Sequence, residues 1–176
     1  MLKLAGRVKA NVAYSFLKFN KLGAAQKLLH ELKYAGNKEV AIYLGTLLAL
    51  DIQSKKIELK ADYLVPVPLH KAKLKERGYN QSEMIAQGIS DVLHIPIKTD
   101  LLFKTKESES QTKRGRAARL VNAMDCYEAP NLPSEHGIAV AIVDDVVTTG
   151  ATLEACCSCL EKCGVSGLSV LSLAVA

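Results

Sequence analysis

The sequence predicts an α/β fold with a mainly parallel central sheet flanked by helices, and three patterns lead to this prediction. Strand and helix patterns alternate from residue 62 to the end of the chain. Residues 138–143 form a continuous apolar run without polar alternation, which is typical of a strand covered on both faces. Residues 167–175 supply a last strand. A chain of 176 residues fits a single domain with one core.

The N-terminal third carries helical rather than strand patterns. Apolar residues recur at helical spacing in two stretches separated by Gly36 and Asn37, namely Leu22, Ala25, Leu28, Leu29 and Leu32, then Val40, Leu44, Leu47 and Leu48. We therefore expect two helices in the first 55 residues. Residues 1–58 are interpreted as a helical N-terminal segment that packs on an α/β core of residues 59–176 within one domain.

Short apolar runs, and the residues that interrupt them, predict the strands and helices of the core. Prolines end the apolar run that starts at Tyr63, and a helix pattern follows from Asn80. A second strand is expected at residues 95–103. Residues 104–119 are polar, contain glycine and lack apolar periodicity, which indicates a flexible loop. The last three expected elements are a strand at 138–143, a helix at 152–163 and a strand at 167–175.

Composition and charge narrow the class of protein. With 49% hydrophobic and 23% charged residues the chain is an ordinary globular one, and no apolar run reaches the roughly 18 residues of a membrane span. Five cysteines, four of them within residues 156–163, suit reduced thiols, so we expect a cytoplasmic protein. Residues 1–120 carry 22 Lys/Arg against 11 Asp/Glu, which could attract a polyanion or could form solvated helix faces.

The segment from Ala139 to Leu153 combines four features that suit a phosphorylated sugar. A buried strand leads to the carboxyl edge of the sheet, where open α/β folds bind ligands. Two adjacent acids, Asp144 and Asp145, can hold the vicinal hydroxyls of a ribose. The hydroxyl and backbone N–H groups that open the next helix suit a phosphate, and Gly150 allows close backbone approach. These residues are Thr148, Thr149, Gly150, Ala151 and Thr152.

Purely structural roles account for only part of this segment. A helix cap would account for any single Asp or Thr. A Walker B strand would also end in acids, but the chain contains neither G-x-x-x-x-G-K-[ST] nor G-x-G-x-x-G. The helix face of Cys156, Cys159 and Cys163 could suggest a metal, but thiols packed against the sheet account for it better.

The residues from Val143 to Thr152 resemble the motif of type I phosphoribosyltransferases that binds 5-phosphoribosyl-1-pyrophosphate (PRPP). Three further stretches resemble the competence protein F (ComF/GntX) branch, so the resemblance covers nearly the whole chain. They are Leu32-Lys33-Tyr34, the pair of Val65–Leu69 with Glu76–Gln81, and Gln111-Thr112 with Arg119 and Asn122. Such chains commonly begin with a four-cysteine zinc ribbon, whereas this sequence has no cysteine before Cys126.

The resemblance implies a Rossmann-like type I phosphoribosyltransferase fold and a role for each matched residue. Asp144 and Asp145 would hold the ribose hydroxyls, directly or through Mg²⁺, and would be catalytic together with Arg77. Val146 would join the two acids in the ribose-phosphate site, and the residues that cradle the 5′-phosphate would be Thr148, Thr149, Gly150, Ala151 and Thr152. The pyrophosphate would bind Arg77 and the turn of Pro66, Val67, Pro68 and Leu69. The mobile loop would comprise Lys104, Gln111, Thr112, Arg114, Arg116 and Arg119.

Two hypotheses of function follow. In the first, a Mg²⁺-dependent phosphoribosyltransferase moves the phosphoribosyl group to an unknown nitrogen acceptor and releases pyrophosphate, with a hood over the site from the N-terminal third. In the second, a non-catalytic protein with this fold acts in DNA uptake or its regulation. DNA binding would need a coherent basic surface that includes Lys71, Lys73 and Lys75. The sequence defines neither the acceptor nor the oligomeric state.

Overall fold

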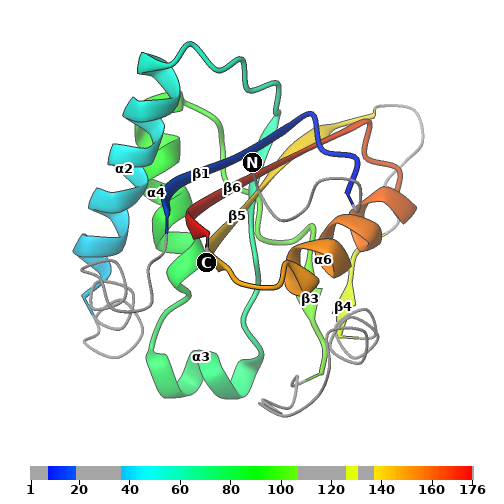
Figure 1. Cartoon of the computed structure of the whole chain (residues 1–176). Coiled ribbons are helices and arrows are strands. Elements are labelled where there is room, and N and C mark those ends of the chain that lie inside the picture. Colours follow the sequence, from blue (N-terminus) through cyan, green and yellow to red (C-terminus); the bar gives the residue numbers. More distant parts are fainter. Residues whose placement is uncertain (1–7, 19–36, 107–125, 131–136, 176) are drawn as a thin grey trace.

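The strands described in the central sheet all pair in parallel, in agreement with the predicted mainly parallel sheet (Figure 1). The computed structural model describes residues 8–18, 37–106, 126–130 and 137–175. In this part of the chain four strands are ordered β1-β6-β5-β2, namely β1 (Val12–Lys18), β6 (Gly167–Val175), β5 (Ala139–Val147) and β2 (Tyr63–Pro66). Helices cover both faces of the sheet, so the predicted α/β class is confirmed.

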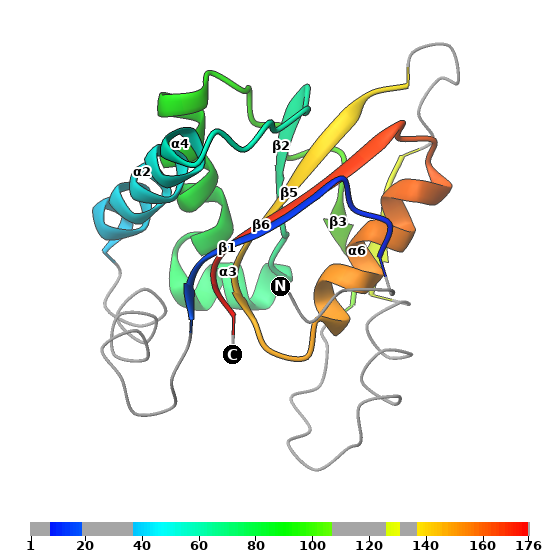
Figure 2. The same ribbon diagram turned by 45° about the horizontal axis from the view of Figure 1, so that its top comes forward.

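Two apolar clusters bury the sheet, and Figure 2 shows the helices that lie on its two faces. Helices α2 (Lys38–Ser54) and α4 (Gln81–Leu93) lie on one face, where Leu48, Ile85 and Leu171 belong to one buried apolar cluster. Helix α6 (Ala151–Lys162) covers the other face together with a small antiparallel hairpin of β3 (Phe103–Lys104) and β4 (Tyr127–Glu128). The central strands are therefore buried on both sides, which explains their continuous apolar runs.

Helices α2 and α4 cross at two glycines. A Cβ atom built on Gly45 would lie 2.1 Å from the backbone oxygen of Ile85, and one built on Gly88 would lie 1.9 Å from that of Ile42. No side chain fits at either point. The glycines therefore allow the two helix backbones to touch, and this contact sets the position of α4 over the sheet.

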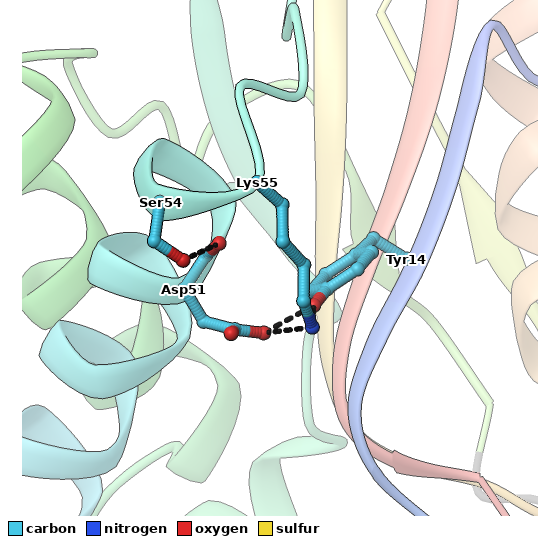
Figure 3. A network of polar contacts seen from close by, with 4 residues as sticks. All are labelled: Tyr14, Asp51, Ser54 and Lys55. Carbon is cyan, nitrogen blue, oxygen red and sulfur yellow. Dashed lines mark hydrogen bonds and ion pairs between the residues drawn. The ribbon is translucent and has the colours of Figure 1, made fainter.

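The prediction that the N-terminal segment is entirely helical was wrong at Val12–Lys18. These residues form β1, which pairs in parallel with β6 from Val12 opposite Ser169 to Lys18 opposite Val175. Figure 3 shows how the strand is tied to α2: the Tyr14 hydroxyl donates to the Asp51 carboxylate, and Lys55 Nζ lies 2.8 Å from the same carboxylate. The second expected helix is present as α2, while residues 19–36 lie outside the described part.

Three further expectations need correction. The single strand expected at residues 95–103 is not formed: Pro96 cannot donate to a ladder, Ile97 makes an isolated bridge to Leu64 on β2, and Phe103 begins β3. Helix α3 (Lys71–Arg77) was missed. It has no buried residue and begins at the His70 cap. Strand β5 is longer than expected and runs through both acids to Val147.

No helix in the described ranges is both long and apolar enough to cross a membrane.

Candidate functional site

The structure brings two of the predicted segments together at one edge of the sheet. Strands β2 and β5 are parallel neighbours, with Pro66 opposite Val143, so both end at the same carboxyl edge. One backbone hydrogen bond continues beyond the strand, from Val67 N to Val143 O at 2.9 Å. The turn after β2 therefore lies beside the two acids of β5. Figure 1 shows α3 and the start of α6 at this same edge.

The two acids of β5 have different surroundings. Asp144 is only 8% exposed, and its Oδ1 accepts a hydrogen bond from the Asp145 backbone N–H at 2.9 Å and lies 3.4 Å from Ser82 Oγ on α4. Asp145 is half-buried, and its Oδ1 accepts from the Val146 N–H at 2.7 Å. A buried carboxylate held by donors is a preorganised charge, so Asp144 is the fixed anion of this edge.

The loop between β5 and α6 has the geometry of an anion cradle. Thr148 is exposed and Thr149 half-buried, and Thr149 Oγ1 lies 3.4 Å from the Ala151 backbone nitrogen. Gly150 adopts a φ of 81°, which favours glycine, and contributes no side-chain cap to α6. The N-cap residue of α6 therefore offers no side chain to the first turn, and the Ala151 N–H is met by the Thr149 hydroxyl of the preceding loop.

The start of α4 fixes the turn after β2, and sequence reasoning missed this role. The Asn80 side chain donates to Val67 O at 3.1 Å while its Oδ1 accepts from Ser82 N at 3.1 Å. Asn80 thus caps α4 and holds the turn in one arrangement. The available signal was the spacing of Asn80 and Glu83, an N-cap residue followed three positions later by an acid.

A cavity of about 530 Å³ lies beside this turn. Its walls are mixed: they combine apolar side chains of the turn, of α3 and of the hairpin with the cations Lys71 and Lys104 and one carboxylate, Glu83. The residues lining it are Pro66, Pro68, Leu69, His70, Lys71, Leu74, Asn80, Glu83, Thr99, Leu102, Phe103, Lys104 and Thr105. Three of the four predicted turn residues line this cavity, whereas Val67 points into the core.

Lys104 of β3 lines this cavity. Its ammonium lies 5.2 Å from the centroid of the Tyr127 ring on the partner strand of the hairpin. Burial lowers the pKa of Lys104, with Lys73 adding to the effect, while the nearby Asp144 carboxylate acts in the opposite direction. Burial also raises the pKa of Tyr127, whose hydroxyl interacts with Thr152 of the predicted phosphate loop.

The predicted loop residues fall into two groups. Lys104 lies in β3 and not in a loop, so that assignment is corrected. Gln111, Thr112, Arg114, Arg116 and Arg119 lie outside the described residues. Arg77, predicted to bind pyrophosphate, donates from NH1 to Gln81 Oε1 at 3.1 Å and does not line the cavity.

The cysteines of α6 serve packing in the described part of the chain. Cys156 and Cys157 are buried, and the thiols of Cys159 and Cys163 lie 3.5 Å from the carbonyl oxygens of Tyr127 and Ala129. Among the described residues no three His, Cys, Asp or Glu side chains come together as a possible metal site. The helix face of thiols therefore faces the core and β4, as the sequence interpretation favoured.

Comparison with known families identifies the fold family. The family model described as "Phosphoribosyl transferase domain" matches residues 80–176, which include α4, β5, the loop at 148–150, α6 and β6. The chain belongs to the phosphoribosyl transferase domain family. The turn of residues 66–69 precedes the matched range, so its assignment rests on its place beside β5.

Curated relatives agree with the predicted branch. Competence protein F of Haemophilus influenzae is 32% identical over 154 residues, which are 84% of this chain and 66% of the relative. DNA utilization protein YhgH of Escherichia coli is 31% identical over 150 residues, or 83% of this chain and 65% of the relative. The chain thus spans about two thirds of the length of the curated relatives it matches.

A solved structure supports the fold independently of these relatives. Glutamine phosphoribosylpyrophosphate (PRPP) amidotransferase from B. subtilis, complexed with ADP and GMP, superposes with a TM-score of 0.50 at 22% identity. The match covers 75% of this chain and 25% of the amidotransferase. At this identity the likeness concerns the fold alone, and it agrees with a parallel sheet flanked by helices.

Proposed function

We propose that this chain binds PRPP at the carboxyl edge of β2 and β5 and transfers its phosphoribosyl group to a nitrogen acceptor. The observation that supports this proposal best is that a buried, donor-held Asp144 and the start of α6, whose N-cap is Gly150, follow one another at the same edge of the sheet. A ribose needs an acceptor for its hydroxyls, and a 5′-phosphate needs N–H donors one sugar length away. This edge of the sheet offers both.

Asp144 and Asp145 fit a magnesium ion that arrives with the substrate. Mg²⁺ favours oxygen ligands and is usually held by one or two carboxylates together with substrate phosphates rather than by a cage of protein side chains. Both acids lie at the edge, and the described residues offer no cluster of three metal-binding side chains that would form such a cage. Bound Mg²⁺ would neutralise charge that develops on the departing pyrophosphate.

The protein's own contribution would be orientation and charge. Transfer breaks the bond from ribose C1 to the pyrophosphate oxygen and forms a bond from C1 to the acceptor nitrogen, whose proton is lost to solvent. Positive charge grows on the ribose ring, where Asp144 would stabilise it, and negative charge grows on the leaving group. No covalent intermediate with the protein is needed.

Calorimetric titration with PRPP in the presence and absence of Mg²⁺ tests this proposal. Asp144→Asn keeps the size of the side chain but removes its charge, so affinity for Mg²⁺-PRPP should fall about 10- to 100-fold, the range for a lost charged hydrogen bond. Glu128→Gln on the exposed side of β4 is a matched control and should leave the affinity unchanged. Unchanged affinity in Asp144→Asn would place the ribose elsewhere.

Handling of DNA is a second candidate function, favoured by the surface around α3. Lys71 and Lys75 are exposed on this helix, and two exposed apolar side chains, Leu74 and Phe103, line the cavity beside them. Cations that contact phosphates and an exposed aromatic ring that stacks on bases are the usual components of a single-strand site. The names of the curated relatives, competence protein and DNA utilization protein, agree with this candidate.

Titration with a fluorescent single-stranded oligonucleotide at several salt concentrations distinguishes the two functions. DNA binding at α3 predicts affinity that falls steeply with salt and weakens when Lys71 and Lys75 are both changed to Gln. Phe103→Ala should weaken it further by about 1–3 kcal/mol, the usual worth of base stacking on an aromatic ring. Negligible affinity at low salt would eliminate this candidate and leave the transferase proposal intact.

A further inference from the structure

A second cavity, of about 420 Å³, lies between α6 and the segment of β4, and two thiols line it. Cys159 lies in the last turn of α6, and Cys163 caps the end of the helix four residues later. Both residues are half-buried. The other residues that line this cavity are Tyr127, Glu128, Ala129, Ala155, Ser158 and Lys162. None of them belongs to the segments that the proposed function uses.

Hydrogen bonds to β4 and to the residue after it hold the two thiols apart. Cys159 Sγ lies 3.5 Å from the Tyr127 carbonyl oxygen, and Cys163 Sγ lies 3.5 Å from the Ala129 carbonyl oxygen. Because a carbonyl oxygen only accepts, each sulfur carries its proton in these contacts. Carbonyl oxygens two residues apart in an extended chain are separated by about 7 Å, so the two sulfurs do not touch at rest.

The spacing of the two cysteines disfavours a disulfide and suits an atom placed between the sulfurs. A disulfide needs Cβ atoms about 3.5–4.5 Å apart, whereas residues four apart on a helix have Cβ atoms about 5–6 Å apart. A soft metal ion adds two bonds of about 2.3 Å each and so spans about 4.6 Å between two sulfurs. Rotation about each Cα–Cβ bond brings the sulfurs to this separation while the helix stays in place.

The surroundings of the pair favour a cation that needs few ligands. The two carbonyl oxygens and the C-terminal end of α6 carry negative partial charge, which attracts a cation. Among the described residues no group of three His, Cys, Asp or Glu side chains could hold a metal, so the tetrahedral set that Zn²⁺ prefers is not offered here. Thiolates select the softer Cu(I), for which two of them suffice.

We propose that Cys159 and Cys163 form a two-coordinate site for Cu(I). Binding breaks two S–H bonds and forms two Cu–S bonds, so one Cu⁺ and two thiols give a complex of charge −1 and two protons that pass to solvent. No electron is transferred. Lys162 lines the same cavity and offsets the remaining charge, and the volume of the cavity leaves room for a small thiol that delivers the ion.

Competition with the chelator bicinchoninate under anaerobic conditions measures the affinity for Cu(I). The wild-type chain should take up one Cu(I), and its affinity should rise with pH because protons are released. Cys159→Ser and Cys163→Ser should each lower the affinity by more than about 100-fold, since the loss of a ligand costs more than the 10- to 100-fold loss caused by removing a ligand's hydrogen-bond partner.

Ser158→Ala is the matched control, because it alters the same cavity and keeps both thiols. This variant should bind Cu(I) as tightly as the wild type. Uptake of Cu(I) that survives in both serine variants would overturn the proposal, and so would a wild-type chain that takes no Cu(I) from the chelator. The proposal is independent of PRPP, so a failure to bind PRPP would leave it intact.

Alkylation of the wild-type chain covers the case in which the serine variants do not fold. Iodoacetamide labelling followed by mass spectrometry reports how accessible each thiol is. Equimolar Cu(I) should slow the labelling of Cys159 and Cys163 together, because both sulfurs are then bonded to the ion. Equal labelling rates with and without Cu(I), or protection of only one of the two thiols, would contradict the two-thiolate site.

Discussion

The contact between α2 and α4 makes a sharp prediction for Gly88→Ala. The new Cβ would lie 1.9 Å from the Ile42 backbone oxygen and 2.7 Å from the Thr46 backbone nitrogen, whereas real Cβ contacts are hardly ever under 3.0 Å. The two helices must therefore separate by about 1 Å, because neither neighbouring atom belongs to a flexible side chain. Overpacking of this kind costs about 3 kcal/mol, and the better helix propensity of alanine returns about 1 kcal/mol.

The expected net loss of unfolding free energy is about 2 kcal/mol, which corresponds to a Tm lower by about 4–8 °C for a chain of this length. Urea denaturation, monitored by circular dichroism, measures this loss of unfolding free energy. Gln87→Ala, at the neighbouring exposed position of α4, is the control and should change stability by no more than about 0.5 kcal/mol. A Gly88→Ala variant as stable as the wild type would refute the close helix crossing.

Three further predictions concern other parts of the chain. Hydrogen bonds from Lys55 and Tyr14 lower the pKa of Asp51, so its contribution to stability is present at neutral pH and is lost as the pH falls through that lowered pKa. The stability difference between wild type and Asp51→Asn should therefore shrink between pH 7 and pH 2 in acid denaturation, and a constant difference would argue against this network. Ser169 Oγ is buried without a hydrogen-bond partner in the structure described, so Ser169→Ala should be neutral or stabilising by up to about 1 kcal/mol in urea denaturation. A clear loss of stability in Ser169→Ala would show that the Ser169 hydroxyl has a hydrogen-bond partner. Burial raises the pKa of Cys157 to about 12, so iodoacetamide at pH 8 should label it only after unfolding, and fast labelling of the native chain would show that the thiol is accessible.

The sequence was most informative where local pattern and tertiary role agree. Residues 167–175 were predicted as the last strand, and β6 has those bounds because its apolar run is buried on both faces. Helix α4 begins one residue after the expected start, since Asn80 is its N-cap. These elements form the centre of the fold, where burial is strongest and periodicity is therefore clearest.

The missed elements depend on information that a local pattern does not contain. Strand β1 pairs with β6, which is more than 150 residues away in the sequence, so its role arises only from tertiary contact. Helix α3 buries no residue and has no apolar stripe. It is defined by its ends, where His70 Nδ1 lies 3.3 Å from the Ala72 backbone nitrogen and Gly78 ends the helix with a φ of 76°.

The candidate site shows the same division. The acids and the phosphate loop were found because one continuous segment carries them. The supporting contacts of Asn80 and Ser82 were missed because they join α4 to the ends of two different strands. Lys104 was expected in a mobile loop, since the sequence around it is polar, yet the pairing of β3 with β4 fixes its place. Site residues whose side chains meet only in the folded protein cannot be predicted from their spacing in the sequence.

Amide hydrogen exchange with and without saturating Mg²⁺-PRPP tests the location of the site most directly. Binding at the carboxyl edge of β2 and β5 predicts slower exchange in two segments, residues 67–70 after β2 and residues 148–153 at the start of α6. Exchange should be unchanged around Ala129, Cys159 and Cys163, which line a separate cavity of about 420 Å³ between α6 and the segment of β4. Protection of that second cavity, with none at residues 148–153, would contradict the proposed site.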